Sequence, residues 1–78
     1  MDKTRYVKGN DEALLITKRH AYEITFTMPY GMKYTSEFSF EDYGSQSNAL
    51  SCAEYELACY GYSKKKGVFI WILKNLSN

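Results

Sequence analysis

The stretch AYEITFTMPYGMKYTSEFSF, residues 21–40, reads as two strands joined by a tight turn. Apolar and polar residues alternate on both sides of residues 29–31, which is the period of a strand with one buried face. Within Pro-Tyr-Gly, the proline suits the first position of a type I turn. Gly31 suits the left-handed residue that closes a three-residue hairpin loop. The stretch therefore predicts an antiparallel hairpin.

The length of this turn fixes the register of the two strands, because successive side chains alternate between the faces. Four pairs are expected on a buried face: Met28–Met32, Phe26–Tyr34, Ile24–Ser36 and Tyr22–Phe38. Three pairs are expected on the other face: Thr27–Lys33, Thr25–Thr35 and Glu23–Glu37. Two carboxylates directly opposite each other are mildly destabilising. Folding alone therefore does not require the Glu23–Glu37 pair, which becomes a candidate binding feature.

A helix is expected after the hairpin. Ser45 or Ser47 can cap its N-terminus, and Gly61 can end it. Five residues share one face of this helix: Ala49, Leu50, Ala53, Leu57 and Tyr60. The small alanines on that face would allow a close approach to the aromatic face of the hairpin.

The segment GVFIWIL, residues 67–73, is the most apolar stretch of the chain. We expect it to form the last strand, after a turn over residues 64–67. Two apolar sets would point in opposite directions, and which set faces the helix stays open: Val68, Ile70 and Ile72, or Phe69, Trp71 and Leu73. In an antiparallel sheet with one face in solvent, apolar and polar residues alternate along each strand. Residues 67–73 are apolar on both sides, so the face opposite the helix needs a cover. Three covers are considered, namely residues 13–16 folded back, a second copy of the chain, or another protein.

Residues 13–16, Ala-Leu-Leu-Ile, fit either a short strand or a helical turn capped by Asn10 or Asp11. The expected order is thus an N-terminal segment followed by β-β-α-β. This order predicts an α+β fold with a small antiparallel sheet of three or four strands and one main helix packed on one face. A length of 78 residues suits a single domain, residues 1–78, with residues 1–12 expected as a mobile N-terminal segment.

The composition, 45% hydrophobic and 24% charged, is that of a globular domain. Residues 21–60 carry one lysine and six carboxylates, whereas residues 61–78 carry four lysines. The N-terminus has no apolar signal segment, and the longest apolar run falls short of the roughly 20 residues of a membrane helix. We therefore expect a soluble, cytoplasmic protein without a membrane partner.

Groups that carry chemistry are few. The chain holds one histidine, His20, and two cysteines, Cys52 and Cys59. Zinc sites use four ligands at short spacings, so no metal and no cofactor is expected. The cysteines lie seven residues apart on the predicted helix, too far for a disulfide, and are interpreted as free, half-buried packing residues. We expect no enzymatic activity, and a cysteine nucleophile is the least favoured hypothesis.

The leading hypothesis is a non-enzymatic protein that binds another protein, with a homodimer as a further expectation. The candidate contact residues are Glu23, Glu37, Glu41, Asp42, Phe69 and Trp71. A small scaffold without chemistry suits a stoichiometric inhibitor or adaptor, such as a phage or mobile-element product that blocks a host nucleic-acid-processing or defence complex. Its acidic groups can engage a basic groove that normally holds nucleic acid, and aromatic side chains are the usual anchors of interfaces.

The alternative hypothesis is nucleic-acid binding. Its candidate residues are Tyr60, Tyr62, Lys64, Lys65 and Lys66. Tyrosine rings can stack on bases while lysines pair with phosphates. A run of three lysines in a chain that is not strongly basic is a weak signal, so this hypothesis ranks second.

Overall fold

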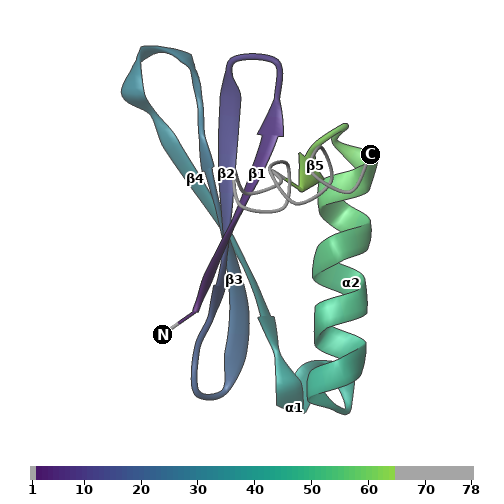
Figure 1. Cartoon of the computed structure of the whole chain (residues 1–78). Helices are drawn as coiled ribbons and strands as arrows, with labels where there is room; N and C mark the ends of the chain where they lie inside the picture. The colour runs from purple at the N-terminus through teal and green to yellow at the C-terminus, as the bar shows by residue number, and fades with distance from the viewer. Residues whose placement is uncertain (1, 65–78) are drawn as a thin grey trace, which may run out of the picture.

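The computed structural model describes residues 2–64 of the protein. Five strands form one antiparallel sheet in the order β4-β3-β2-β1-β5 (Figure 1). The strands are β1 (Lys3–Lys8), β2 (Asp11–Thr17), β3 (Ala21–Thr27), β4 (Lys33–Ser39) and β5 (Ser63–Lys64). A short 3-10 turn, η1 (Pro29–Gly31), joins β3 to β4, and a short helix, α1 (Phe40–Tyr43), leads from β4 to the main helix, α2 (Gln46–Cys59). The fold is therefore α+β, as expected.

The sheet has more strands than the three or four that the sequence indicates. Residues 3–8, assigned to an N-terminal segment, form β1, which pairs with β2 on one side and with β5 on the other. Residues 13–16 lie in β2, between β1 and β3. Of the two alternatives for residues 13–16, the strand is therefore confirmed and the helical turn is wrong. The possibility that these residues fold back to cover the sheet is also wrong, because they are part of the sheet.

The β3–β4 hairpin has the predicted register. Tyr22 lies opposite Phe38, and Glu23 lies opposite Glu37. The backbone N–H of Met28 donates to the carbonyl oxygen of Met32 at 2.6 Å, which closes the three-residue loop. The loop differs from the expected turn in one respect, since Tyr30 as well as Gly31 has a positive φ.

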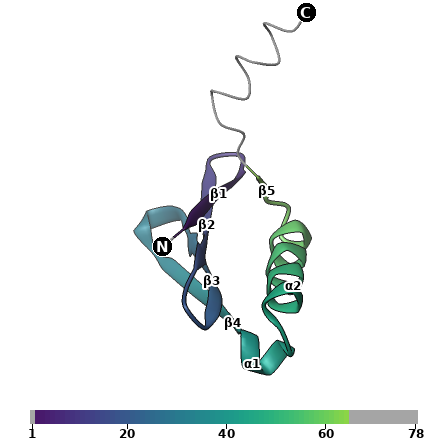
Figure 2. The ribbon, with the colours of Figure 1, turned by 60° about the horizontal axis from the view of Figure 1, so that its bottom comes forward.

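The core lies between α2 and one face of the sheet, which we call the inner face (Figure 2). The side chains of Ala49, Ala53 and Leu57 are fully buried on α2. They pack with residues from all four long strands, namely Tyr6, Ala13, Leu15, Tyr22, Ile24, Phe26 and Phe38. The alanines have no side chain beyond the β-carbon, so they allow α2 to approach the sheet closely.

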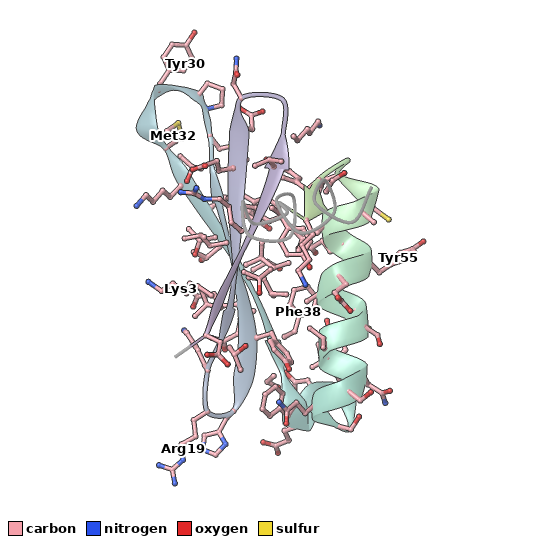
Figure 3. The ribbon with its side chains drawn as sticks, viewed as in Figure 1. Lys3, Arg19, Tyr30, Met32, Phe38 and Tyr55 are labelled. Carbon is pink, nitrogen blue, oxygen red and sulfur yellow. The ribbon has the colours of Figure 1, made fainter. Side chains whose placement is uncertain are left out.

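Part of the expected buried face is exposed. Met28, Met32 and Tyr34 retain 42%, 68% and 53% of their accessible surface. The reason is geometric, because the β3–β4 turn projects away from α2, with Tyr30 and Met32 at its tip (Figure 3). Tyr60, expected on the buried face of the helix, is also 51% exposed because it lies just past the end of α2.

The ends of α2 confirm the predicted caps. The hydroxyl oxygen of Ser45 accepts the backbone N–H of Asn48 at 3.0 Å. After the last turn, Gly61 adopts a φ of +86°, which is the left-handed conformation that favours glycine. The predicted strand over residues 67–73, with its unassigned faces, lies outside the described residues.

Candidate functional site

The face of the sheet opposite α2, which we call the outer face, is not covered by any element of residues 2–64. The register arranges its side chains in three rows across the strands: Lys3–Ile16–Glu23–Glu37, Arg5–Leu14–Thr25–Thr35, and Val7–Glu12–Thr27–Lys33. Figure 3 shows the contrast between the faces, with Phe38 between the sheet and α2 and Lys3 on the other side. The outer face is the larger candidate surface.

Apolar side chains follow a diagonal across this face. Leu14 and Ile16 come from the central strand β2, and Val7 comes from the neighbouring strand β1. All three are only half-buried, whereas Leu15 on the inner side of β2 is buried. The outer face thus has apolar side chains on β1 and β2, and threonines and charged side chains next to them in each row.

The Glu23–Glu37 pair lies at one margin of the outer face. The Nζ atom of Lys18, in the turn between β2 and β3, pairs with Oε2 of Glu23 and lies 3.6 Å from Oε2 of Glu37. The hydrogen bond to Glu23 is the largest cause of a raised pKa for Lys18, and the two carboxylate charges add to it. Lys18 therefore offsets part of the like-charge repulsion, and the cluster keeps one net negative charge.

The other predicted contact residues are not gathered with this pair. Glu41 and Asp42 are exposed on α1, which turns from the end of β4 toward α2 (Figure 1). The backbone N–H of Asp42 donates to the hydroxyl oxygen of Ser39 at 3.0 Å, so Ser39 caps α1. Phe69 and Trp71 lie outside the described residues.

A second candidate site is a pocket of about 360 Å³ at the exposed end of the inner face, which we call the aromatic pocket. It is lined by Lys8, Asp11, Phe26, Met28, Tyr34, Tyr60 and Tyr62. The buried ring of Phe26 is central to it, with ring centroids of Tyr60 and Tyr62 each 5.5 Å away and that of Tyr34 at 5.9 Å. The volume is within the range of small-ligand pockets.

Charged groups border the aromatic pocket. The Nζ atom of Lys8 lies 6.0 Å from the ring centroid of Tyr62. Desolvation raises the pKa of the Tyr62 hydroxyl, and the carboxylate of Asp11 adds to the effect. A tyrosine hydroxyl is protonated at neutral pH even without this shift, so that of Tyr62 can donate a hydrogen bond to a bound group.

The structure brings together only part of the predicted nucleic-acid set. Tyr60 and Tyr62 both line the aromatic pocket, and Lys64 follows in β5, opposite Tyr6 of β1. Lys65 and Lys66 lie outside the described residues. Sequence reasoning missed the contribution of Tyr34, because strand alternation assigns it to the core and gives no sign that α2 stops short of it.

Both cysteines are exposed free thiols on α2. The interpretation of Cys52 and Cys59 as half-buried packing residues is therefore wrong, because they lie toward solvent rather than beside Ala53 in the core. Among residues 2–64, no three histidine, cysteine, aspartate or glutamate side chains are grouped so that they could hold a metal ion. No helix in the same part of the chain is long and apolar enough to cross a membrane.

Comparison with known proteins found no matching family model, no matching curated protein and no matching solved structure.

Proposed function

We propose that this protein acts by binding another protein through its outer face, as a stoichiometric inhibitor or adaptor. One observation carries the proposal. Leu14 and Ile16 come from the central strand of the sheet, yet they remain half-exposed on the face opposite α2. A partner that covered these side chains would gain roughly 25 cal/mol of free energy for each Å² of apolar surface buried. The sheet would not have to rearrange.

The charges of the outer face support a particular class of partner. The acidic margin formed by Glu23 and Glu37 keeps a net negative charge despite Lys18. The opposite margin, on β1, carries Lys3 and Arg5, and Arg5 pairs with Glu12 at 3.3 Å. A partner that meets the acidic margin with basic side chains would be oriented by this division. A host complex whose basic groove holds nucleic acid would be such a partner. The protein would then be a phage or mobile-element product that blocks this complex in the cytoplasm.

The experiment combines capture with measured binding. The purified chain is used to capture partners from a host lysate, and each stoichiometric partner is then purified and titrated against variants. Thr25→Lys places a long charged side chain at the centre of the outer face without removing a core group. Tyr55→Lys makes a matched change on the far side of α2, where Tyr55 points away from the sheet (Figure 3).

Support requires a partner whose affinity falls about tenfold or more with Thr25→Lys and is unchanged with Tyr55→Lys, a difference of roughly 1.4 kcal/mol or more in binding. The double variant Glu23→Gln/Glu37→Gln tests the charge component, because it should slow association most at low salt. Equal binding by wild type and Thr25→Lys would exclude the outer face as the contact surface.

A second function has its own observation. The aromatic pocket presents three tyrosine rings around Phe26, with Lys8 at its border. Such a site can stack an unpaired base while a lysine meets the phosphate. We infer single-stranded nucleic acid as the ligand in this case. Titration with a labelled oligonucleotide at low salt tests the inference. Binding should weaken steeply with added salt and with Tyr34→Ala, whereas Tyr55→Ala should have no effect.

A further inference from the structure

β4 lies at one edge of the sheet, and its outward backbone groups have no partner strand within residues 2–64. Antiparallel pairs alternate between hydrogen-bonded and non-hydrogen-bonded positions. The bonds from Met28 N–H to the Met32 carbonyl and from Phe40 N–H to the His20 carbonyl lie at the two ends of the hairpin. They place the even-numbered residues of β4 in the hydrogen-bonded pairs with β3. The N–H and C=O groups of Lys33, Thr35 and Glu37 therefore point outward from the edge.

Edge strands with free backbone groups are templates for another strand. β4 is seven residues long and contains no proline, so length and composition do not prevent an added strand. Its two charged residues are Lys33 and Glu37, both with side chains on the outer face. They are the groups that select which strand can be added, because like charges directly opposite are destabilising and opposite charges are favourable.

We propose that β4 is the dimerisation edge of this protein and that its occupant is β4 of a second copy. In an antiparallel pairing across a two-fold axis at Thr35, each Lys33 lies opposite Glu37 of the second copy. The pairing thus contains two opposite-charge pairs on the outer face and one Thr35–Thr35 contact on the axis. About six backbone hydrogen bonds form, two from each of the three hydrogen-bonded pairs.

The surroundings of the two charged residues favour this register. Lys33 makes no ion pair within residues 2–64. Glu37 keeps 58% of its side-chain surface exposed, and its contact with Lys18 is the longer of that lysine's two ion pairs. Both groups are thus available across the edge, and the pairing is self-complementary, as a two-fold interface requires.

On the inner face, the same pairing would cover part of two exposed apolar side chains. With Thr35 on the axis, Tyr34 comes beside Ser36 of the second copy, and Met32 comes beside Phe38 of the second copy. Tyr34 and Met32 are 53% and 68% exposed in the single chain. The dimer would shield part of this surface, and it would join the outer faces of both copies into one continuous sheet surface. The inference does not rest on the proposed function, because an edge contact leaves the apolar side chains of the outer face uncovered. The two proposals share Glu37, and Lys33 of the second copy would add a positive charge beside the acidic margin.

The proposal is tested by sedimentation equilibrium of the full chain, which gives the mass of the species in solution at concentrations up to about 1 mM. The wild type should form dimers, and Lys33→Glu and Glu37→Lys should each weaken dimerisation about tenfold, because every Lys–Glu pair becomes a like-charge pair. The double variant Lys33→Glu/Glu37→Lys should recover dimerisation. An equimolar mixture of the two single variants should form heterodimers, since all cross-strand pairs are then of opposite charge.

Two further variants isolate the backbone contribution. Thr35→Pro removes an N–H that points away from β3, so the chain should keep its fold and become monomeric. Lys3→Glu makes the same charge change as Lys33→Glu at the other side of the sheet, and dimerisation should be unaffected. If Thr35→Pro fails to fold, the complementary charge variants still decide the question.

A wild type that is monomeric throughout this concentration range would overturn the proposal. A dimer with unchanged affinity in Lys33→Glu and Glu37→Lys would overturn it as well, because the second copy would then occupy another surface such as the outer face. Slowed exchange of the Thr35 and Glu37 amide hydrogens at high concentration would support it, since these amides are free in the monomer.

Discussion

Glu23 and Glu37 lie directly opposite each other on β3 and β4, at a position where like charges repel. The structure reduces the repulsion with Lys18, whose ammonium group reaches both carboxylates from the preceding turn. The cluster is therefore both a structural contact and part of the acidic margin of the outer face.

We predict that Lys18→Met lowers the stability of the fold, because the two carboxylates then face each other without a counter-charge. The loss should shrink as salt rises from about 0.1 M to about 1 M, since the Debye length falls from about 10 Å to about 3 Å. Urea unfolding at both salt concentrations measures it. Adding Glu37→Gln to Lys18→Met should restore most of the stability, and a loss that is insensitive to salt would contradict an electrostatic origin.

The core prediction concerns Leu57, which is fully buried between α2 and the sheet. Leu57→Ala should cost about 2–5 kcal/mol because it leaves a cavity. Ala53→Leu at the neighbouring buried position should cost about 1–3 kcal/mol through overpacking. Chemical denaturation followed by circular dichroism gives both values. Tyr55→Ala, on the exposed side of the same helix, serves as the control and should change stability by less than about 0.5 kcal/mol.

The prediction for stability at alkaline pH concerns Tyr6. Burial raises the pKa of its hydroxyl above the ordinary 10.0, and the charge of Glu54 adds to this shift. The unfolded chain loses this proton first, so stability should fall as pH rises above 10.0 toward the raised pKa of Tyr6. Unfolding free energies measured from pH 8 upward should show the decline. Tyr6→Phe should make it less steep, whereas Tyr30→Phe at the exposed turn should leave it unchanged.

The thiol prediction concerns Cys52 and Cys59. Both thiols are exposed on α2, so both should react with a disulfide reagent in the native state without prior unfolding. Seven residues of helix separate their α-carbons by about 10 Å, beyond the roughly 7 Å limit for a disulfide. Mild oxidation should therefore produce cross-linked chains and no internal disulfide. Mass spectrometry under non-reducing conditions distinguishes the two products, and a monomer lighter by two hydrogens would contradict the prediction.

The hairpin could be predicted from the sequence because its information is local. Alternation and loop length together determine which residues of β3 and β4 face each other, and the structure confirms Tyr22–Phe38 and Glu23–Glu37. β2 could not be assigned in the same way. Its run Ala-Leu-Leu-Ile has no alternation, because a central strand with apolar side chains on both faces gives no period-two signal.

The candidate sites differ in the same way, since one depends on local sequence and the other on distant segments. Glu23 and Glu37 could be paired from their distances to one turn, but the role of Lys18 depends on how the chain reverses between β2 and β3. The aromatic pocket unites Phe26 and Tyr34 of the hairpin with Tyr60 and Tyr62 beyond α2. No local pattern links residues so far apart in the chain, because their approach depends on the path of α2 across the sheet.

The sequence by itself determined the hairpin, its register and the caps of α2. Each of these results from interactions among residues within about 20 positions of one another, where turn geometry and side-chain alternation leave few arrangements. Within residues 2–64, the tertiary structure decided the order of the five strands, the outer face that no element covers, and the position of β4 at an edge of the sheet. These features depend on where distant segments pack, and burial of apolar surface selects that packing for the whole chain rather than for any one stretch.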